Sequence, residues 1–171
     1  MRTDPHLHYL DNAATTLVDP AVADAVNAAM RSCWANPSSL YEPAILAENK
    51  LSAARGKIAK TLGCAKDEIY FTACGSESNN LAILGAAIPR QSWGNKIVTT
   101  GFEHPSVQRP IRALKDRGFT VVEIPPEPDG SLDVQKLIDA VDKSTVLAAC
   151  MAVNNETGAV QDIARLAAGV K

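Results

Sequence analysis

Several features are missing from this sequence, and each absence narrows the class of protein. No stretch is basic enough to favour nucleic acid or an anionic membrane, since the 171 residues carry a net charge of −2. The longest apolar runs, such as 146–153, are too short to span a bilayer, and residues 1–6 lack the apolar segment of a secretory signal. We therefore expect a cytoplasmic protein with no nucleic-acid partner and no membrane partner.

Paired cysteines and common catalytic patterns are also missing. The four cysteines stand far apart and form no CxxC pair: Cys33, Cys64, Cys74 and Cys150. In a chain of this size that spacing indicates reduced, mostly buried thiols rather than a disulfide framework. The patterns HExxH, Walker A and GxSxG do not occur, and we expect no metal site.

What is present is a regular alternation of strand-like and helix-like segments. The apolar content of 46% and the charged content of 21% are typical of a globular protein with a core. Strand-like segments are expected at 69–72, 96–100, 119–124 and 145–151, and helix-like segments at 76–87, 105–117 and 133–141. Each gap is long enough for the crossover that parallel strands require. The pattern predicts an α/β fold with a mainly parallel sheet and flanking helices.

The segments outside this alternation differ from it. Residues 6–10 alternate like a strand within an N-terminal arm, which we assign to residues 1–16. Helices are expected at 20–33 and 43–62, the first with its apolar residues directed inward (Val22, Val26, Ala29 and Met30). Residues 160–171 resemble the start of another helix with no strand after it. The sequence looks cut, so we interpret residues 17–171 as part of a large domain.

Ligands of parallel α/β sheets lie beyond the carboxyl ends of the strands, which draws attention to the segments that follow them. Polar residues occur there at Ala73–Ser76, at 101–104 and at 152–156. Gly75 and Ser76 open a helix, where N–H groups and a hydroxyl suit a phosphate or carboxylate. A plain turn with a serine cap explains the same two residues.

Two further candidate site residues, His104 and Asn155, also have a purely structural explanation. His104 lies between a strand and a helix, where an imidazole could stack on a bound ring, transfer protons, or simply be a polar residue at a helix entrance. Asn155 belongs to an Asn-Asn-Glu turn, which is either turn chemistry or an amide donor for a ligand.

The ordered motifs of the chain resemble those of the cysteine desulfurases, pyridoxal-phosphate enzymes of the class V aminotransferase group with fold type I. The motifs that carry the resemblance are Tyr9-Leu10-Asp11-Asn12-Ala13-Ala14-Thr15-Thr16, Asn36-Pro37-Ser38-Ser39, Gly75-Ser76-Glu77-Ser78-Asn79-Asn80, Glu103-His104 and Asn154-Asn155-Glu156-Thr157-Gly158. The resemblance runs from about Tyr9 to the last residue and matches the N-terminal portion of the family.

The resemblance implies a role for particular residues. Gly75 and Ser76 match the turn that binds the cofactor phosphate, and His104 matches the histidine that stacks on the pyridine ring and is proposed to move protons. Asn155 matches an amide near the ring oxygen and the substrate carboxylate. The segment with Ala13 and Thr15 matches one that approaches the substrate pocket.

The resemblance also implies the reaction of the complete enzyme. Members of the family take sulfur from L-cysteine, leave L-alanine and pass the sulfur to an acceptor protein, in pathways that include iron–sulfur cluster assembly. They are homodimers, and we expect a homodimer or self-association here. A selenocysteine lyase or another class V aminotransferase shares most of these motifs, and a non-catalytic, partner-binding remnant is a further alternative.

The covalent lysine, its aspartate partner and the sulfur-accepting cysteine loop of the family have no counterpart in residues 1–171. We therefore expect this polypeptide alone to be inactive as a desulfurase, and its retention of pyridoxal phosphate is open. Sulfide release from cysteine in the presence of the cofactor would contradict that expectation.

Overall fold

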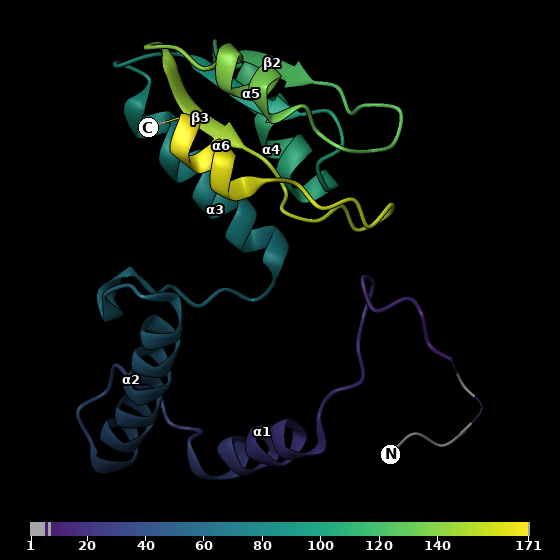
Figure 1. The fold of residues 1–171 in the computed structure, drawn as a ribbon. Coiled ribbons are helices and arrows are strands. Elements are labelled where there is room, and N and C mark those ends of the chain that lie inside the picture. Colours follow the sequence, from purple (N-terminus) through teal and green to yellow (C-terminus); the bar gives the residue numbers. More distant parts are fainter. Residues whose placement is uncertain (1–5, 7, 171) are drawn as a thin grey trace. The chain divides into compact units, whose positions relative to one another are not determined.

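The computed structural model describes His6 and residues 8–170. The chain divides into two compact units, Met1–Phe71 and Thr72–Lys171. The first unit contains α1 (Pro20–Ser32), α2 (Glu42–Leu62) and the short helix η1 (Lys66–Glu68). The second contains α3 (Gly75–Ala87), η2 (Ile88–Arg90), β1 (Lys96–Thr100), α4 (Pro105–Lys115), β2 (Thr120–Ile124), α5 (Val134–Ala140), β3 (Thr145–Ala149) and α6 (Ile163–Gly169) (Figure 1).

The two long helices of the first unit start and end close to their predicted positions. The carboxylate of Asp19 accepts a hydrogen bond of 2.8 Å from the backbone N–H of Ala21, and Pro20 occupies the first turn of α1. Gly63 ends α2 with φ of 68°, a left-handed conformation that costs glycine little. The predicted helices are confirmed.

The predicted inward face of α1 is wrong for the first unit taken by itself. Val22, Val26 and Met30 are 54%, 52% and 67% exposed, and none of the described residues of α1 is buried. An apolar stripe shows that a helix needs an apolar partner, but it does not say which segment supplies one. In α2 the buried side chains are small: Ala44, Ala47 and Ala59.

The described part of the second unit contains a parallel sheet in the order β2-β1-β3. Lys96 at the start of the central strand is in register with Thr120 of β2 and with Thr145 of β3. Helices α4 and α5 lie between successive strands in the sequence. The prediction of a mainly parallel α/β sheet is confirmed.

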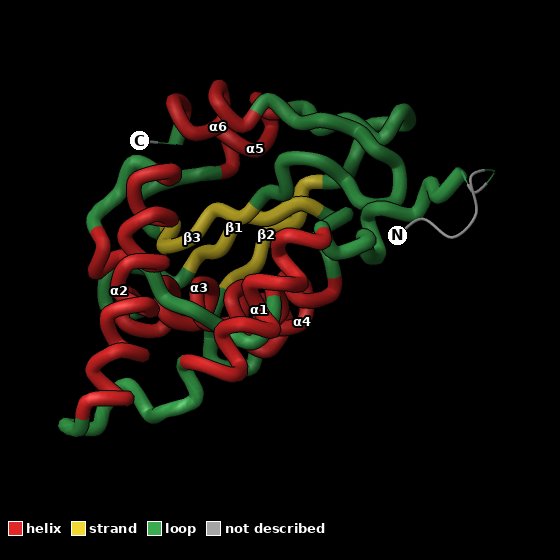
Figure 2. Tube along the Cα trace, turned by 90° about the horizontal axis from the view of Figure 1, so that it is seen from below, coloured by secondary structure: helices red, strands yellow, loops and turns green. Residues whose placement is uncertain are grey.

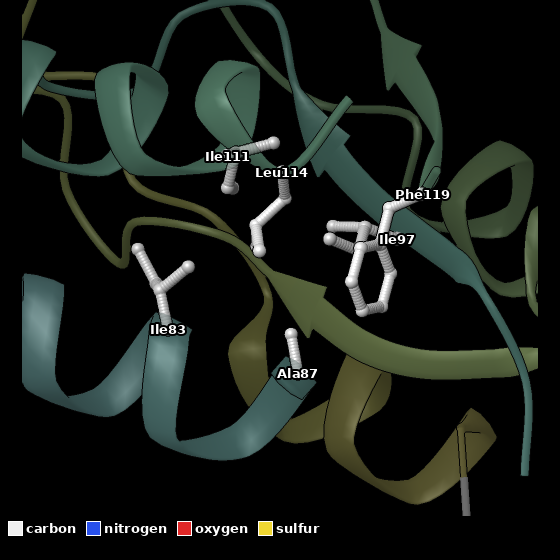
Figure 3. Close-up of a cluster of buried hydrophobic side chains, with 6 residues drawn as sticks. All are labelled: Ile83, Ala87, Ile97, Ile111, Leu114 and Phe119. Atoms are coloured by element: carbon white, nitrogen blue, oxygen red, sulfur yellow. The ribbon is translucent and has the colours of Figure 1, made fainter. Parts of the chain in front are cut away.

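The two faces of the sheet carry separate cores, because successive side chains of a strand point to opposite faces. Ile97 packs with α3 and α4, whereas Val98 packs with α5 and α6, and Figure 2 shows α3 and α4 on one side of the strands and α5 and α6 on the other. The buried residues of the first core, drawn in Figure 3, are Ile83, Ala87, Ile97, Ile111, Leu114 and Phe119. The buried residues of the second core are Val98, Ile124, Leu132, Val134, Leu137 and Leu166.

Two predicted strands do not form. Residues 69–72 form no strand pairing with any other segment of the described chain, and Tyr70 and Phe71 are 76% and 47% exposed. In the arm, residues 8–10 are likewise unpaired, while Leu7 lies outside the described residues. Strand propensity reflects packing against neighbouring strands, so a suitable sequence stays irregular where no neighbour is available. The assignment of residues 1–16 as an arm and 17–171 as one large domain stays a prediction.

Candidate functional site

The N-terminus of α3 leaves hydrogen-bond donors open. Cys74 precedes the helix in an extended conformation and gives it no side-chain cap. Within the described residues, the N–H groups of Gly75 and Ser76 and the hydroxyl of Ser76 have no partner, and the Ser76 side chain is exposed. The carboxylate of Glu77 accepts from the N–H of Ala73 at 2.6 Å and so occupies part of this end. The remaining donors and the helix dipole suit an anion such as a phosphate group.

Gly75 itself lacks the strain that would demand glycine. Its φ is not positive, and a Cβ added there would meet nothing within 4 Å. The fold of the chain therefore tolerates a larger residue at position 75. A glycine would matter at this point only for the close approach of a ligand to the backbone.

His104 caps the first turn of α4. Its Nδ1 accepts a hydrogen bond of 3.1 Å from the backbone N–H of Ser106 and lies 2.7 Å from the Ser106 hydroxyl. That hydroxyl also lies 2.8 Å from Nδ2 of Asn79 on α3. The starts of α3 and α4 are thereby joined through three polar side chains.

Glu103 fixes the loop that carries His104. It is buried, with 5% of its surface exposed, and its Oε1 accepts from the Thr100 hydroxyl at 2.6 Å and from the Met151 N–H at 2.7 Å. A second link runs from Nδ2 of Asn154 to the carbonyl of Phe102 at 3.2 Å. The segments after β1 and β3 are therefore held together, as the sequence predicts for strand ends that share one edge of a sheet.

Asn155 lies in the turn that follows β3. The buried Asn154 builds this turn, because its Oδ1 accepts from the N–H groups of Glu156 and Thr157 at 2.9 Å each. Gly158 closes the turn with φ of 74°. The amide of Asn155 is exposed and donates to Glu156 Oε1 at 2.7 Å, so it is engaged locally.

An open cavity of about 550 Å³ adjoins His104. Its walls come from α3, α4 and the carboxyl end of β3 and are mainly apolar. The polar lining residues are Asn79, Glu103 and His104. Gly75, Ser76 and Asn155 do not line it.

Ala13 and Thr15 lie in the first unit, where the Asp11 carbonyl accepts from the N–H groups of Ala14 and Thr15 at 3.2 and 3.4 Å. Both residues are exposed within that unit. Their role as substrate contacts stays a prediction.

The thiols of the chain differ in their electrostatic environment. Burial, and to a smaller extent the Glu103 carboxylate, raises the pKa of Cys150 to about 11. The Ser32 hydroxyl and then the Lys50 ammonium lower the pKa of Cys33. In the part of the chain that the structure describes, all four cysteines are unpaired, and no group of three His, Cys, Asp or Glu residues could hold a metal.

Three residues of this region were missed as site candidates from the sequence: Asn79, Glu103 and Ser106. Glu103 had a readable signal, because an ionisable residue three positions after a buried strand has to be exposed or paired. Asn79 and Ser106 had none, because only the packing of α3 against α4 brings them together.

The α/β sheet, the uncapped start of α3 and the histidine at the start of α4 place candidate ligand-binding groups beyond the strand ends, as in other parallel α/β proteins. The aminotransferase class-V family matches residues 8–171, and the chain belongs to that family. The NifS/IcsS protein homolog of Lactobacillus delbrueckii subsp. bulgaricus is 40% identical over 155 residues, which cover 91% of this chain and 40% of that protein. The cysteine desulfurase IscS of Haemophilus ducreyi is 42% identical over 158 residues, 91% of this chain and 39% of that protein.

Solved structures agree with this assignment. A NifS-like protein superposes with a TM-score of 0.89 at 35% identity, over 94% of this chain and 44% of the other. SspA in complex with cysteine gives 0.87 at 36% identity, over 94% and 46%. The resemblance to cysteine desulfurases is confirmed, as is the fold-type I architecture, and the chain spans about 40% of the length of the curated relatives it matches. No helix among the described residues is long and apolar enough to cross a membrane.

Proposed function

We propose that this chain contributes the phosphate-binding turn and the ring-contact residues of a pyridoxal-phosphate-dependent cysteine desulfurase. The observation that carries the proposal is the pair of helix starts: donors without partners at α3, joined through Asn79 and Ser106 to His104 at α4. The start of α3 suits a phosphate group and the start of α4 suits an aromatic ring. The hydrogen bonds of Asn79 and Ser106 connect the two helix starts.

Each residue has a distinct part in this proposal. The N–H groups of Gly75 and Ser76 and the Ser76 hydroxyl would hold the cofactor phosphate. His104 would lie against the pyridine ring, where stacking and proton transfer are the two roles open to it, and Asn155 would donate to the ring oxygen or the substrate carboxylate. Ala13 and Thr15 would contact the substrate. Pyridoxal phosphate, when bound, supplies an electron sink that weakens bonds at the substrate α-carbon.

The names of the relatives favour L-cysteine as substrate. An acceptor protein for the sulfur and L-alanine as the product are part of the same proposal. Selenocysteine lyase chemistry uses the same cofactor site, and no specific feature of the described residues favours it. The four unpaired cysteines support a reducing compartment, and we propose the cytoplasm.

Binding of pyridoxine 5′-phosphate to the 171-residue chain tests the phosphate turn. This compound has an alcohol in place of the aldehyde, so it cannot react with surface lysines. Calorimetric titration should show binding that is stronger than that of pyridoxine without phosphate. Ser76→Ala should weaken it by about tenfold, the value of one hydrogen bond to a charged group.

The matched control is Ser92→Ala, which removes another exposed serine hydroxyl that has no partner among the described residues. This variant should bind like the parent chain. Equal affinity of all three proteins, or equal affinity for the phosphorylated and unphosphorylated compounds, would contradict the proposal.

A further inference from the structure

We propose that Asn79 and Ser106 are positioning residues that hold the His104 imidazole with its proton on Nε2 and with Nδ1 committed as an acceptor. The consequence for catalysis rests on the proposed function. The hydrogen bonds themselves lie within the second unit and do not depend on a cofactor.

One backbone N–H group determines which atom donates and which accepts in each hydrogen bond of this network. The Ser106 amide lies 3.1 Å from Nδ1 of His104, and a backbone N–H can only donate. Nδ1 therefore presents its lone pair. A neutral imidazole carries one proton, so that proton is on Nε2.

The Ser106 hydroxyl connects the His104 ring to α3 by a second hydrogen bond. Its oxygen lies 2.7 Å from the same Nδ1, and since Nδ1 accepts, the hydroxyl must donate its only proton there. The hydroxyl oxygen is left with lone pairs, so the side chain of Asn79 faces it with the donating Nδ2, at 2.8 Å. A residue of α3 thus sets the orientation of a ring on α4.

This arrangement discriminates between the roles open to His104. For Nε2 to act as a base, the neutral ring would need its proton on Nδ1, where it would face the N–H of Ser106. The network opposes that state. It favours His104 as a ring that stacks and donates a hydrogen bond from Nε2, and it disfavours His104 as the group that removes a proton.

Nitrogen-15 NMR of the full 171-residue chain tests the assignment without a cofactor. The sequence has three histidines, so loss of one signal in His104→Gln and of another in His8→Gln assigns both rings, and the exposed His8 is the internal reference. At about pH 8.5, roughly two units above the ordinary pKa of an imidazole, the ratio of the Nε2–H to the Nδ1–H form should be higher for His104 than for His8. A scalar coupling across the hydrogen bond should connect the Ser106 amide nitrogen with Nδ1.

The variants separate positioning from stability. Ser106→Ala should lower the tautomer ratio by roughly two- to tenfold, the factor that one hydrogen bond is worth, and Ser106→Thr should restore it because it keeps the hydroxyl. Asn79→Asp should also lower the ratio, because a carboxylate would turn the hydroxyl proton away from Nδ1. Ser76→Ala, a matched change at the start of α3, should leave the ratio unaltered.

A proton on Nδ1 of His104 in the parent chain would overturn the proposal. A ratio that neither Ser106→Ala nor Asn79→Asp alters would also overturn it, even if those variants were less stable. Failure of pyridoxine 5′-phosphate to bind would count against the proposed function alone, since the tautomer is measured on the unliganded chain.

Discussion

Glu103 links the end of β1 to the segment that follows β3. Its Oε1 receives two short hydrogen bonds, one from the Thr100 side chain and one from the Met151 backbone. Both donors are provided by the ends of neighbouring strands, and the side chain that receives them is buried. Removing the acceptor would leave donors without partners where water has little access, which costs more than the hydrogen bonds contributed.

We therefore expect Glu103→Ala to lower the free energy of unfolding by about 2–4 kcal/mol. Glu103→Gln is the matched control, because its amide oxygen can accept from the same two donors, and it should cost less than about 1 kcal/mol. Urea denaturation followed by circular dichroism measures both. An equal loss in the two variants would show that the charge, and not the acceptor, is what matters.

The cysteines give a second prediction at the residue scale. Thiolates react with iodoacetamide and thiols do not, so the raised pKa of Cys150 makes it slow to react and the lowered pKa of Cys33 makes it fast. At pH 8 the thiolate fraction of Cys150 is at least about a hundredfold below that of an ordinary cysteine. Its rate should rise with pH up to about 11, whereas that of Cys33 should level off earlier.

Mass spectrometry of peptides after timed labelling measures these rates. In Glu103→Gln, Cys150 should react somewhat faster, because the nearby negative charge contributes to its raised pKa. Similar labelling rates for Cys150 and Cys33 between pH 8 and pH 11 would contradict the prediction.

The candidate site was predictable from the sequence only in part. His104 and Ser76 stand out by chemical type and by their place at helix starts. The bridge of Asn79 and Ser106 does not, because it spans 27 residues and exists only once α3 and α4 are packed together. Resemblance to a family assigns a role to single positions, and it does not reveal contacts between them.

At the scale of helices and strands, local sequence signals predicted the bounds of the helices well. Asp19 and Gly63 mark helix ends through interactions with their immediate neighbours, which a sequence contains in full. The prediction of a strand at 69–72 was wrong, because a strand depends on a partner strand that the local sequence does not identify. The same limit applies to the apolar face of α1.

Two glycines allow opposite predictions. Gly94, just before β1, lies so close to Ser144 that an added Cβ would be 2.2 Å from its carbonyl oxygen, whereas a Cβ at Gly85 in the exposed part of α3 would meet nothing within 4 Å. Gly94→Ala should destabilise by about 1–3 kcal/mol through overpacking. Gly85→Ala should stabilise by about 0.5–1 kcal/mol, since alanine favours a helix interior.

Thermal or urea unfolding of both variants measures this difference. A neutral Gly94→Ala would show that the segment before β1 shifts away from Ser144 at little cost. A destabilised Gly85→Ala would mean that this side of α3 is covered.

At the scale of the molecule, the exposed apolar side of α1 predicts self-association. Light scattering should give a mass that rises with protein concentration. Glutamate at Val22, Val26 and Met30 should reduce that rise. Glutamate at Ala28 and Arg31, on the other side of the same helix, is the control and should have a smaller effect. A monodisperse monomer of the parent chain would contradict the prediction.

The overall α/β class was predictable because it depends on the alternation of elements and on crossover length, and both can be read along the chain. The division into two units was not predicted. It depends on which side chains find partners, and the long apolar residues of α1 find none among the described residues of the first unit.

The order of the strands has a consequence for how the second unit folds. The central strand β1 comes first in the chain, and its pairing with β3 closes a segment about twice as long as its pairing with β2. Doubling a loop costs only about 0.6 kcal/mol in closure entropy, but longer-range contacts form later. During synthesis β1, α4 and β2 are also made before β3. The contact between Glu103 and Met151 therefore belongs to the last step of sheet assembly. A chain arrested before that step would have part of its core formed, but the strand-end edge with the candidate site would be unformed.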